Sequence, residues 1–431
     1  MTDKDKSGYR SDTHMIHGQF RTEKWEYDHH VIPPITASTT FRLDSASRGR
    51  QGFVDFGEPK KSAQAMNPVY IYDRLDEPTV GMLEDLFREI EQGESACAFA
   101  CGMSAISAAL MVACHAGSNI VAHRTLYGCT FSLMTNWLPR FGVDVRFVDA
   151  RDLDQLRGAM DGETRAVYLE TPANPTMECL DVAAVKDVIE LLNRDRPGKE
   201  RIVLVADNTF ATPWAQRPLE LGADLVVESL TKDVGGFGVD MGGMVVAPRR
   251  FHKSLRGFRK DFGGVLPPGG AWRLMVYGVS TLSLRVRRQT ETAWEVARFL
   301  EGHDKVARVS YPGLDSYAGK EVARRQLVDP DGRFCPGFMV YFEVTGGLEE
   351  ARARCERLVN HIASHSYCIT LAVSLGMTKT LVETPGLMTH SVMDAGSQSE
   401  AGIHPGGVRL AMGLESPSDI IRDLTEALDG C

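Results

Sequence analysis

Short runs of apolar residues recur along the first two thirds of the chain, and polar or glycine-bearing positions separate them. Runs of this length predict buried strands rather than helices. They are Ala96–Phe99, Ile120–Ala122, Val143–Val148, Ala166–Leu169, Ile202–Ala206, Leu225–Val227 and Met244–Ala247.

Between most of these runs the apolar positions change to helical spacing. Leu83, Leu86, Phe87 and Ile90 fall on one face of a helix. Further helices are predicted over Met103–Cys114, Thr130–Phe141 and Val182–Leu192, and a long one over Ala271–Leu300. Strands that alternate with helices predict an α/β fold with a mainly parallel sheet covered on both faces.

The pattern divides the 431 residues into three segments. Residues 1–70 are largely polar and irregular and predict an N-terminal arm that packs on something else. Residues 71–275 carry the alternating pattern and predict an α/β domain. Residues 276–431 mix a strand with helices and predict a smaller α+β domain; these elements are Gly337–Val344, Leu348–Ala363 and Ser418–Leu428.

Composition excludes several classes of protein. The net charge of −9 argues against nucleic acid and anionic membranes as partners. The polar N-terminus lacks the apolar core of a signal peptide, and no apolar run is long enough to span a bilayer. The nine cysteines include no Cys-x-x-Cys pair, which favours a soluble protein of the cytoplasm without a metal site.

The segment between the last two predicted strands is the strongest candidate for chemistry. It places Lys232 among the hydroxyls of Ser229 and Thr231, ahead of a glycine-rich stretch. A lysine in such surroundings can form an imine with an aldehyde cofactor, of which pyridoxal phosphate is the common one. The hydroxyls and glycine N–H groups suit its phosphate. A surface lysine before a glycine-rich turn is the alternative.

Other candidates lie where predicted strands end. Asp207 can pair with a protonated pyridine nitrogen, or it can be a turn aspartate. Gly102 and Met103 begin a helix, and their N–H groups suit a phosphate. Tyr127 can stack on a cofactor ring or simply pack. Arg409, in an apolar run, requires either a substrate carboxylate or an internal salt bridge.

Taken together, these segments resemble the Cys/Met-metabolism family of pyridoxal-phosphate enzymes, from about residue 30 to the C-terminus. The matching motifs occur in the family's order. They are Tyr72-Asp-Arg74, Gly102-Met103, Glu170-Thr-Pro-Ala-Asn-Pro175, Asp207-Asn-Thr209, Ser229-Leu-Thr-Lys232, Ser374-Leu-Gly376, Met388-Thr-His390 and Arg409.

The resemblance implies the type I aminotransferase-like fold, with 71–275 as the pyridoxal-phosphate-binding domain. It also implies a homotetramer, a dimer of dimers with shared active sites. Tyr72 and Arg74 would reach the phosphate of the neighbouring subunit, and Asn174 would lie beside the cofactor's phenolic oxygen. Ser374 and Arg409 would hold the substrate carboxylate.

Within the family, the loop Leu126-Tyr-Gly-Cys-Thr-Phe131 is most similar to the methionine γ-lyase branch, because Cys129 replaces a second glycine. Lys260-Asp261 also resembles that branch. The chain departs from the family pattern at Cys101, Asp233, Phe237 and Lys379, where serine, an aromatic residue, histidine and glutamate are usual. These departures bear on substrate choice more than on cofactor chemistry.

The resulting functional hypothesis is γ-elimination from methionine or a related amino acid, which yields 2-oxobutanoate, ammonia and a thiol. Lys232 would move the α-proton, Asp207 would keep the cofactor ring protonated, and Tyr127, with a pKa lowered beside the cofactor, would protonate the leaving group. The alternatives are cystathionine cleavage, γ-replacement on an O-acylhomoserine, and a cofactor-binding protein without turnover.

Overall fold

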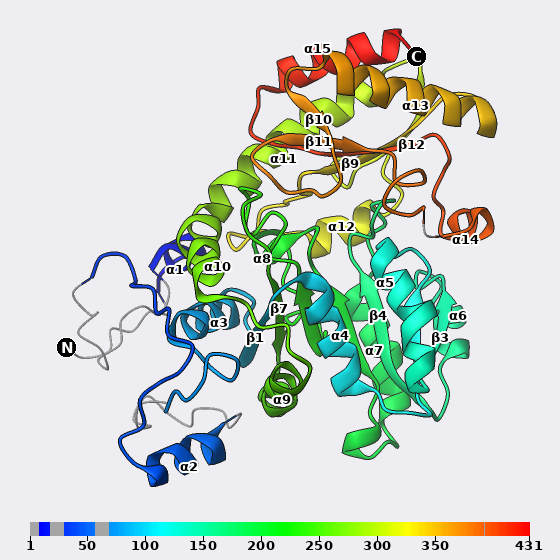
Figure 1. The fold of residues 1–431 in the computed structure, drawn as a ribbon. Helices are drawn as coiled ribbons and strands as arrows, with labels where there is room; N and C mark the ends of the chain where they lie inside the picture. Colours follow the sequence, from blue (N-terminus) through cyan, green and yellow to red (C-terminus); the bar gives the residue numbers. More distant parts are fainter. Residues whose placement is uncertain (1–7, 18–29, 57–68, 392) are drawn as a thin grey trace.

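The computed structural model describes residues 8–17, 30–56, 69–391 and 393–431. It consists of a larger body built on a seven-stranded sheet and a smaller body built on a five-stranded sheet. The long helix α11 (Ser280–Glu301) runs from one body to the other (Figure 1). Parts of the predicted arm, 18–29 and 57–68, lie outside the described residues.

The large sheet has the strand order β1-β7-β6-β5-β4-β2-β3. Strands β2 to β6 run parallel to one another, which confirms the predicted mainly parallel sheet. Strand β7 is antiparallel to β6 and β1, because the segment after β6 turns back without a crossover helix. The strands are β1 (Ser95–Phe99), β2 (Asn119–His123), β3 (Asp144–Val148), β4 (Thr164–Glu170), β5 (Val203–Asp207), β6 (Leu225–Glu228) and β7 (Gly243–Ala247).

Helices cover both faces of this sheet, which explains why its inner strands are largely apolar. Along β4, Ala166 and Tyr168 join the core beneath α4, while Val167 and Leu169 join the core beneath α6 and α7. The helices of this body are α3 (Pro78–Ile90), α4 (Gly102–Ala113), α5 (Gly128–Ser132), α6 (Leu153–Ala159), α7 (Val182–Asn193), α8 (Thr212–Ala215), α9 (His252–Phe262) and α10 (Pro268–Arg273).

The small sheet has the order β10-β11-β12-β9-β8; α11 and α13 pack on it, and α15 packs on these two helices. Its strands are β8 (Val306–Ser310), β9 (Met339–Val344), β10 (Ile369–Leu371), β11 (Thr380–Glu383) and β12 (Gly407–Ala411). The accompanying helices are α12 (Lys320–Gln326), α13 (Leu348–His365), α14 (Ala395–Glu400) and α15 (Pro417–Asp429).

Two predicted helices differ in detail. The helix predicted over Thr130–Phe141 begins as α5, continues as the π-helix η2 (Leu133–Trp137) and ends as the 3₁₀-helix η3 (Leu138–Phe141), where Pro139 removes a backbone donor. The helix predicted over Ala271–Leu300 is interrupted by the π-helix η6 (Leu274–Val279) between α10 and α11. Short 3₁₀ turns, η4 (Gly198–Glu200) and η5 (Arg249–Phe251), complete the element order.

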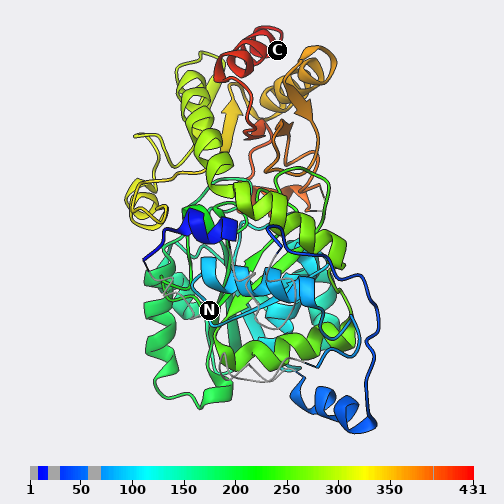
Figure 2. The ribbon, with the colours of Figure 1, turned by 90° about the vertical axis from the view of Figure 1, so that its left-hand side faces the viewer.

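The predicted irregular arm contains two helices among its described residues, α1 (Ser11–His17) and α2 (Ala46–Asp55). Helix α1 packs on α11 and α3 through Met15, which is 1% exposed (Figure 2). A short helix with one buried apolar residue has no helical pattern of apolar positions, so the polar sequence did not reveal it. In the part of the chain that is described, no helix is long and apolar enough to cross a membrane.

Candidate active site

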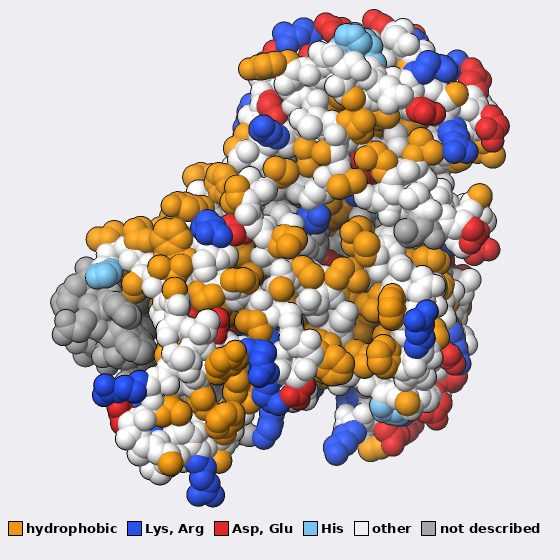
Figure 3. All heavy atoms as spheres, in the orientation of Figure 1, with side chains coloured by type: hydrophobic (Ala, Val, Ile, Leu, Met, Phe, Trp, Pro, Cys, Tyr) orange, Lys and Arg blue, Asp and Glu red, His pale blue; other side chains and the backbone are white. Residues whose placement is uncertain are grey.

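A cavity of about 240 Å³ lies at the carboxyl ends of β4, β5 and β6, where the small body meets the large one. Figure 3 shows the surface hollowed between the two bodies. The large body contributes the N-terminus of α4 and the segment that carries Lys232, and the small body contributes Ser374 and Arg409. Residues far apart in the sequence thus meet in one site.

Lys232 lies in a turn after β6, and its amine donates a hydrogen bond of 2.8 Å to the hydroxyl of Ser374. Burial, aided by the positive charge of Arg409, lowers the pKa of Lys232 from 10.5 to about 8. A substantial fraction of the amine is therefore unprotonated near neutral pH, as a nucleophile or base requires. Ser374 has φ of +88°, a strained conformation for a serine, and strain of this kind is typical of functional sites.

The N-terminus of α4 and the strand end before Lys232 approach each other closely. A Cβ atom on Gly102 would lie 2.8 Å from Cβ of Ser229, and one on Gly243 would lie 2.2 Å from the carbonyl oxygen of Cys101. Only glycine fits at these positions. Cys101 caps α4 without a side-chain hydrogen bond, so the first N–H groups of the helix remain free for an anion.

Asp207 lies at the end of β5, within the same cavity. One carboxylate oxygen accepts a bond of 3.0 Å from the N–H of Thr209, and the other accepts a bond of 3.1 Å from the hydroxyl of Tyr168. Burial raises the pKa of Asp207, while these bonds lower it. A protonated ring nitrogen beside it would stabilise the carboxylate. These groups therefore fit a pyridoxal phosphate. The N-terminus of α4 offers donors for the phosphate, and Asp207, in the same cavity, offers an acceptor for the pyridine nitrogen.

Tyr127 caps the short helix α5, and its N–H donates to Glu170 at 2.8 Å. The lowering predicted for its pKa depends on a bound cationic cofactor and stays a prediction, while the protein's own groups act in the opposite direction. Burial raises the pKa of Tyr127, and the neighbouring Cys129, Glu170 and Glu383 raise it further. The phenol therefore stays protonated. Cys129 is exposed and lies beside this phenol.

Arg409 makes the internal salt bridge that the sequence left open as one of two alternatives. Its Nη1 lies 2.9 Å from Glu383 and donates to Asn174 at 2.8 Å, and its Nη2 donates to the carbonyl of Ser374 at 2.8 Å. Arg409 and Glu383 face each other across β12 and β11.

Arg409 nevertheless retains free donors. Its buried Nε has no partner in the described part of the chain, and Nη2 has two hydrogens for its one acceptor there. Nε and Nη2 form the side of a guanidinium that binds a carboxylate in a bidentate manner. The arginine is thus held by the protein and still able to bind a substrate.

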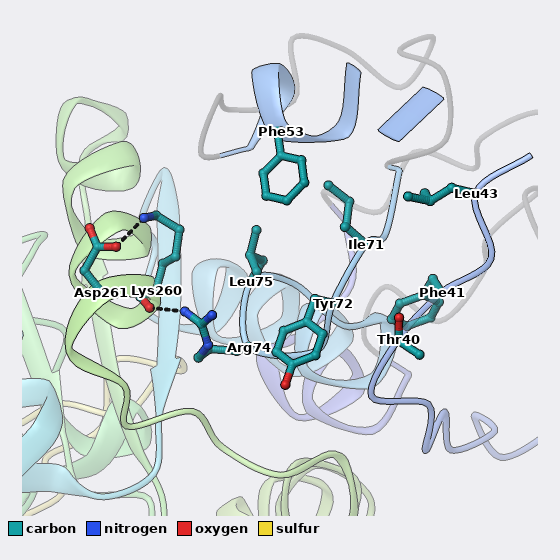
Figure 4. A pocket seen from close by; sticks show the side chains of 10 residues that line it. All are labelled: Thr40, Phe41, Leu43, Phe53, Ile71, Tyr72, Arg74, Leu75, Lys260 and Asp261. Carbon is teal, nitrogen blue, oxygen red and sulfur yellow. Dashed lines mark hydrogen bonds and ion pairs between the residues drawn. The ribbon is translucent and has the colours of Figure 1, made fainter. Parts of the chain in front are cut away.

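Tyr72 and Arg74 lie outside this cavity. With Lys260 and Asp261 they line a separate hollow of about 550 Å³ on the surface (Figure 4). The Arg74 guanidinium donates to the backbone carbonyl of Lys260 and lies over the ring of Tyr72, 5.6 Å from its centre. The structure thus brings these four residues together, away from Lys232.

Behind the cavity lies a pair of buried carboxyl groups that the sequence did not suggest. The side-chain amide of Asn208, next to Asp207, donates to Glu91 at 3.0 Å and to Glu228 at 2.9 Å. The second oxygen of each carboxyl group is buried without a hydrogen-bond donor among the described residues. Burial raises the pKa of both groups, and Glu91 raises that of Glu228 further. A proton shared by the two groups satisfies both oxygens.

The remaining departures from the family pattern occupy different places. Asp233 is fully buried beneath the Lys232 turn, and Phe237 is 40% exposed beneath Arg285. Lys379 is exposed and is not among the described side chains that line the cavity, so its side chain lies away from the site. The Nε2–H of His390 donates a hydrogen bond of 3.1 Å to the carbonyl of Leu126 and so fixes the loop of Tyr127. Over the described ranges, no group of three His, Cys, Asp or Glu residues could hold a metal ion.

Comparison with known proteins places this site in a family. Residues 12–429 match the model of the Cys/Met metabolism PLP-dependent enzymes. An L-methionine gamma-lyase of Fusobacterium nucleatum subsp. polymorphum is 40% identical over 398 residues, which cover 92% of this chain and 93% of the relative. A cystathionine beta-lyase of Lactococcus lactis subsp. cremoris is 34% identical over 97% of this chain and 98% of the relative.

Among solved structures, a cystathionine gamma-lyase from Lactobacillus plantarum complexed with L-serine superimposes with a TM-score of 0.84 at 29% identity. The match covers 98% of this chain and 99% of the other. The chain belongs to the Cys/Met-metabolism family of pyridoxal-phosphate-dependent enzymes. The predicted family, type I aminotransferase-like fold and pyridoxal phosphate cofactor are therefore confirmed.

Proposed function

We propose that the protein catalyses γ-elimination from methionine or a related γ-substituted amino acid, releasing 2-oxobutanoate, ammonia and a thiol. The observation that carries the proposal is that one cavity holds an amine of lowered pKa, a protonated phenol and an arginine with free donors, from Lys232, Tyr127 and Arg409. These are the base, the acid and the carboxylate anchor that the reaction requires. The similarity to L-methionine gamma-lyases supports the same reaction.

The cofactor would be held at three points. The N–H groups of Gly102 and Met103, with the hydroxyls of Ser229 and Thr231, would bind its phosphate. Asp207 would accept a hydrogen bond from its ring nitrogen, and the free amide hydrogens of Asn174 would reach its phenolic oxygen. Pyridoxal phosphate, joined first to Lys232 and then to the substrate amine that displaces it, would supply an electron sink for negative charge at the reacting carbon.

The protein side chains would then move protons at defined atoms. Lys232 in its unprotonated form takes the proton from Cα of the substrate, and the lowered pKa makes this form available. Ser374, which already accepts a bond from the amine, orients it. A second proton leaves Cβ, the electron pair that remains there expels the sulfur from Cγ, and Tyr127 donates a proton to the departing sulfur. Its raised pKa keeps that proton on the phenol until the leaving group becomes basic.

Arg409 would orient the substrate through Nε and Nη2, since Nη1 is occupied by Glu383 and Asn174. A bidentate contact fixes the carboxylate in a plane and thereby limits rotation about Cα. Substrates that lack an α-carboxylate should bind poorly for this reason.

A second copy of the chain would complete the site. Tyr72 and Arg74 lie on a surface with Lys260 and Asp261, away from Lys232 of their own chain, so they are placed to serve a neighbour. Phe53 lines the same hollow and is exposed, as are Val54 and Phe262, which adjoin Phe53 and Asp261 in the chain, and exposed apolar surfaces mark interfaces. We propose a homotetramer, a dimer of dimers with shared sites.

The proposed division of the chain remains an arm over 1–70, a cofactor-binding domain over 71–275 and an α+β domain over 276–431, with the boundary just before α11. We also propose that the enzyme works in the cytoplasm. All nine cysteines are free thiols, which suits a reducing compartment.

Product analysis of the purified holoenzyme tests the reaction. With L-methionine alone we expect 2-oxobutanoate and methanethiol in equal amounts, and none from Lys232→Ala. O-acetyl- and O-succinyl-homoserine should be offered with and without a thiol, and cystathionine in parallel. If methionine is inert while an acylhomoserine and a thiol give a thioether faster than any oxo acid, the enzyme catalyses γ-replacement and the proposal is wrong.

A further inference from the structure

Lys232 lies at the start of a tight turn that faces helix α11. The N–H of Gly236 donates to the carbonyl of Lys232 at 2.9 Å, which closes the turn. The carbonyls of Asp233 and Val234 point outward, and both accept hydrogen bonds from the guanidinium of Arg285 on α11. A cation at the carbonyl end of such a turn is favourable, as it is at the end of a helix.

The guanidinium of Arg285 is itself held in place. It donates to the carbonyl of Gly278 at 2.8 Å and to the hydroxyl of Thr281 at 3.0 Å. Gly278 belongs to the π-helix η6, and a Cβ atom there would lie 2.4 Å from the carbonyl oxygen of Val234. The helix backbone therefore rests directly on the lysine turn, and π-helical segments often occur at functional sites.

A second side chain of α11 joins the lysine turn to the loop that carries Ser374. The amide nitrogen of Gln289 donates to the carboxylate of Asp233 at 3.0 Å and to the carbonyl of Met377 at 3.2 Å. The two chain segments also contact each other directly. A Cβ atom on Gly376 would lie 2.3 Å from the N atom of Asp233. A backbone bond of 2.9 Å from the N–H of Thr378 to the carbonyl of Gly236 also joins the two segments, and the glutamine adds a side-chain link to each.

Asp233 connects these contacts. Its carboxylate lies 3.2 Å from Arg285, and its second oxygen has no donor among the described residues. Its side chain is fully buried, as are those of Gln289 and, to within 3%, Arg285. A buried carboxylate is costly unless it is paired and hydrogen-bonded, and here the paired residue directly follows Lys232 in the chain.

We propose that Asp233, Arg285 and Gln289 form a clamp of positioning residues that sets the distance between the amine of Lys232 and Ser374. Because Ser374 also offers its carbonyl to Arg409, the clamp fixes the lysine relative to the carboxylate anchor. None of the three clamp residues lines the described cavity, so each acts through the backbone. The inference rests on the proposed role of Lys232.

The test removes the two donors of the glutamine while keeping its length. In Gln289→Met holoenzyme we expect the pKa read from the visible absorbance of the bound cofactor to shift, and kcat for L-methionine to fall roughly tenfold or more with KM within about twofold. Displacement of reacting groups by as little as 1 Å has effects of this size. Thr292→Val is the matched control, because Thr292 is equally buried on α11 but bonds only its own helix at Arg288. It should leave both quantities unchanged.

A second pair of variants separates positioning from folding. Asp233→Asn keeps an acceptor for Gln289 and should stay near wild type, whereas Asp233→Ala should reproduce the losses of Gln289→Met. If Gln289→Met and Asp233→Ala lower only the melting temperature and leave the absorbance pKa and kcat at wild-type values, the clamp is structural and the inference is wrong. The absorbance titration needs no substrate. Failure of methionine as a substrate would therefore refute the proposed reaction and leave the clamp testable.

Discussion

Replacing the proposed catalytic lysine should stabilise the cofactor-free protein near neutral pH. In the folded chain, burial and Arg409 lower the pKa of Lys232 from 10.5 to about 8. Below pH 8 the folded protein therefore holds a buried ammonium at a cost that the unfolded chain avoids. Lys232→Met keeps most of the apolar stem and removes the charge.

The size of the effect follows from linkage. One pKa unit corresponds to about 1.4 kcal/mol, so the shift represents roughly 3 kcal/mol of unfavourable free energy in the folded state. The variant also loses the hydrogen bond to Ser374, which contributes about 1 kcal/mol. We expect a net gain of about 2 kcal/mol at pH 7. At about 2 cal/mol/K of unfolding entropy per residue, a chain of 431 residues should melt about 2 °C higher.

The difference in stability between the two proteins should depend on pH. Between pH 8 and 10.5 the folded protein binds fewer protons at this site than the unfolded chain, so wild-type stability rises with pH and the advantage of the variant shrinks. Thermal unfolding of both cofactor-free proteins at pH 7 and pH 10 measures this difference. Lys199→Met, at an exposed lysine, is the control and should show no such trend. A Lys232→Met protein less stable than wild type at pH 7, or a gap that is constant with pH, would refute the reasoning.

Three further predictions address other parts of the molecule. Glu228→Gln should stabilise the protein above neutral pH and have little effect near pH 4, because the raised pKa of the buried pair makes wild-type stability fall as pH rises; unfolding curves that coincide at every pH would contradict the shared proton. Inactive Arg74→Ala and Lys232→Ala chains, co-assembled, should recover part of the activity, since some sites then combine an intact Arg74 and an intact Lys232. No recovery in verified mixed oligomers would mean that Arg74 serves its own chain. Lys379→Glu should leave the ranking of neutral, cationic and anionic γ-substituents unchanged, because the side chain is exposed and lies away from the cavity; a reversed ranking in competition assays would show otherwise.

The sheet could be predicted because parallel strands buried on both faces appear as continuous apolar runs. The helix breaks could not be predicted in the same way. Helical spacing is similar in α- and π-helices, so the pattern over Ala271–Leu300 does not reveal the π-helix at Leu274–Val279. A run of apolar residues does not show which strands will be its neighbours or in which direction it will run. The antiparallel pairing of β7 with β6 could therefore not be predicted.

The candidate site could be predicted where one residue type in one context implies a chemistry, as for Lys232, Asp207 and Arg409. It could not be predicted where the effect comes from distant residues. Arg409 meets Glu383 only because β11 and β12 pair in a particular register, although an acidic residue ending an apolar run was a signal for Glu383. The contribution of the protein's own groups to the pKa of Tyr127 could not be predicted for the same reason, because burial and the distant Glu170 and Glu383 raise it.

The ion pair between Glu383 and Arg409 bears on how the product leaves. The arginine's charge is already matched when an amino acid arrives, so the incoming molecule is accommodated as a zwitterion whose ammonium balances its own carboxylate. Once ammonia has departed, the 2-oxo acid is an anion held close to Glu383, and like charges repel strongly in a buried site. The ion pair between Glu383 and Arg409 thus allows the substrate to bind but lowers the affinity of the site for the product. Lower product affinity favours turnover over product inhibition.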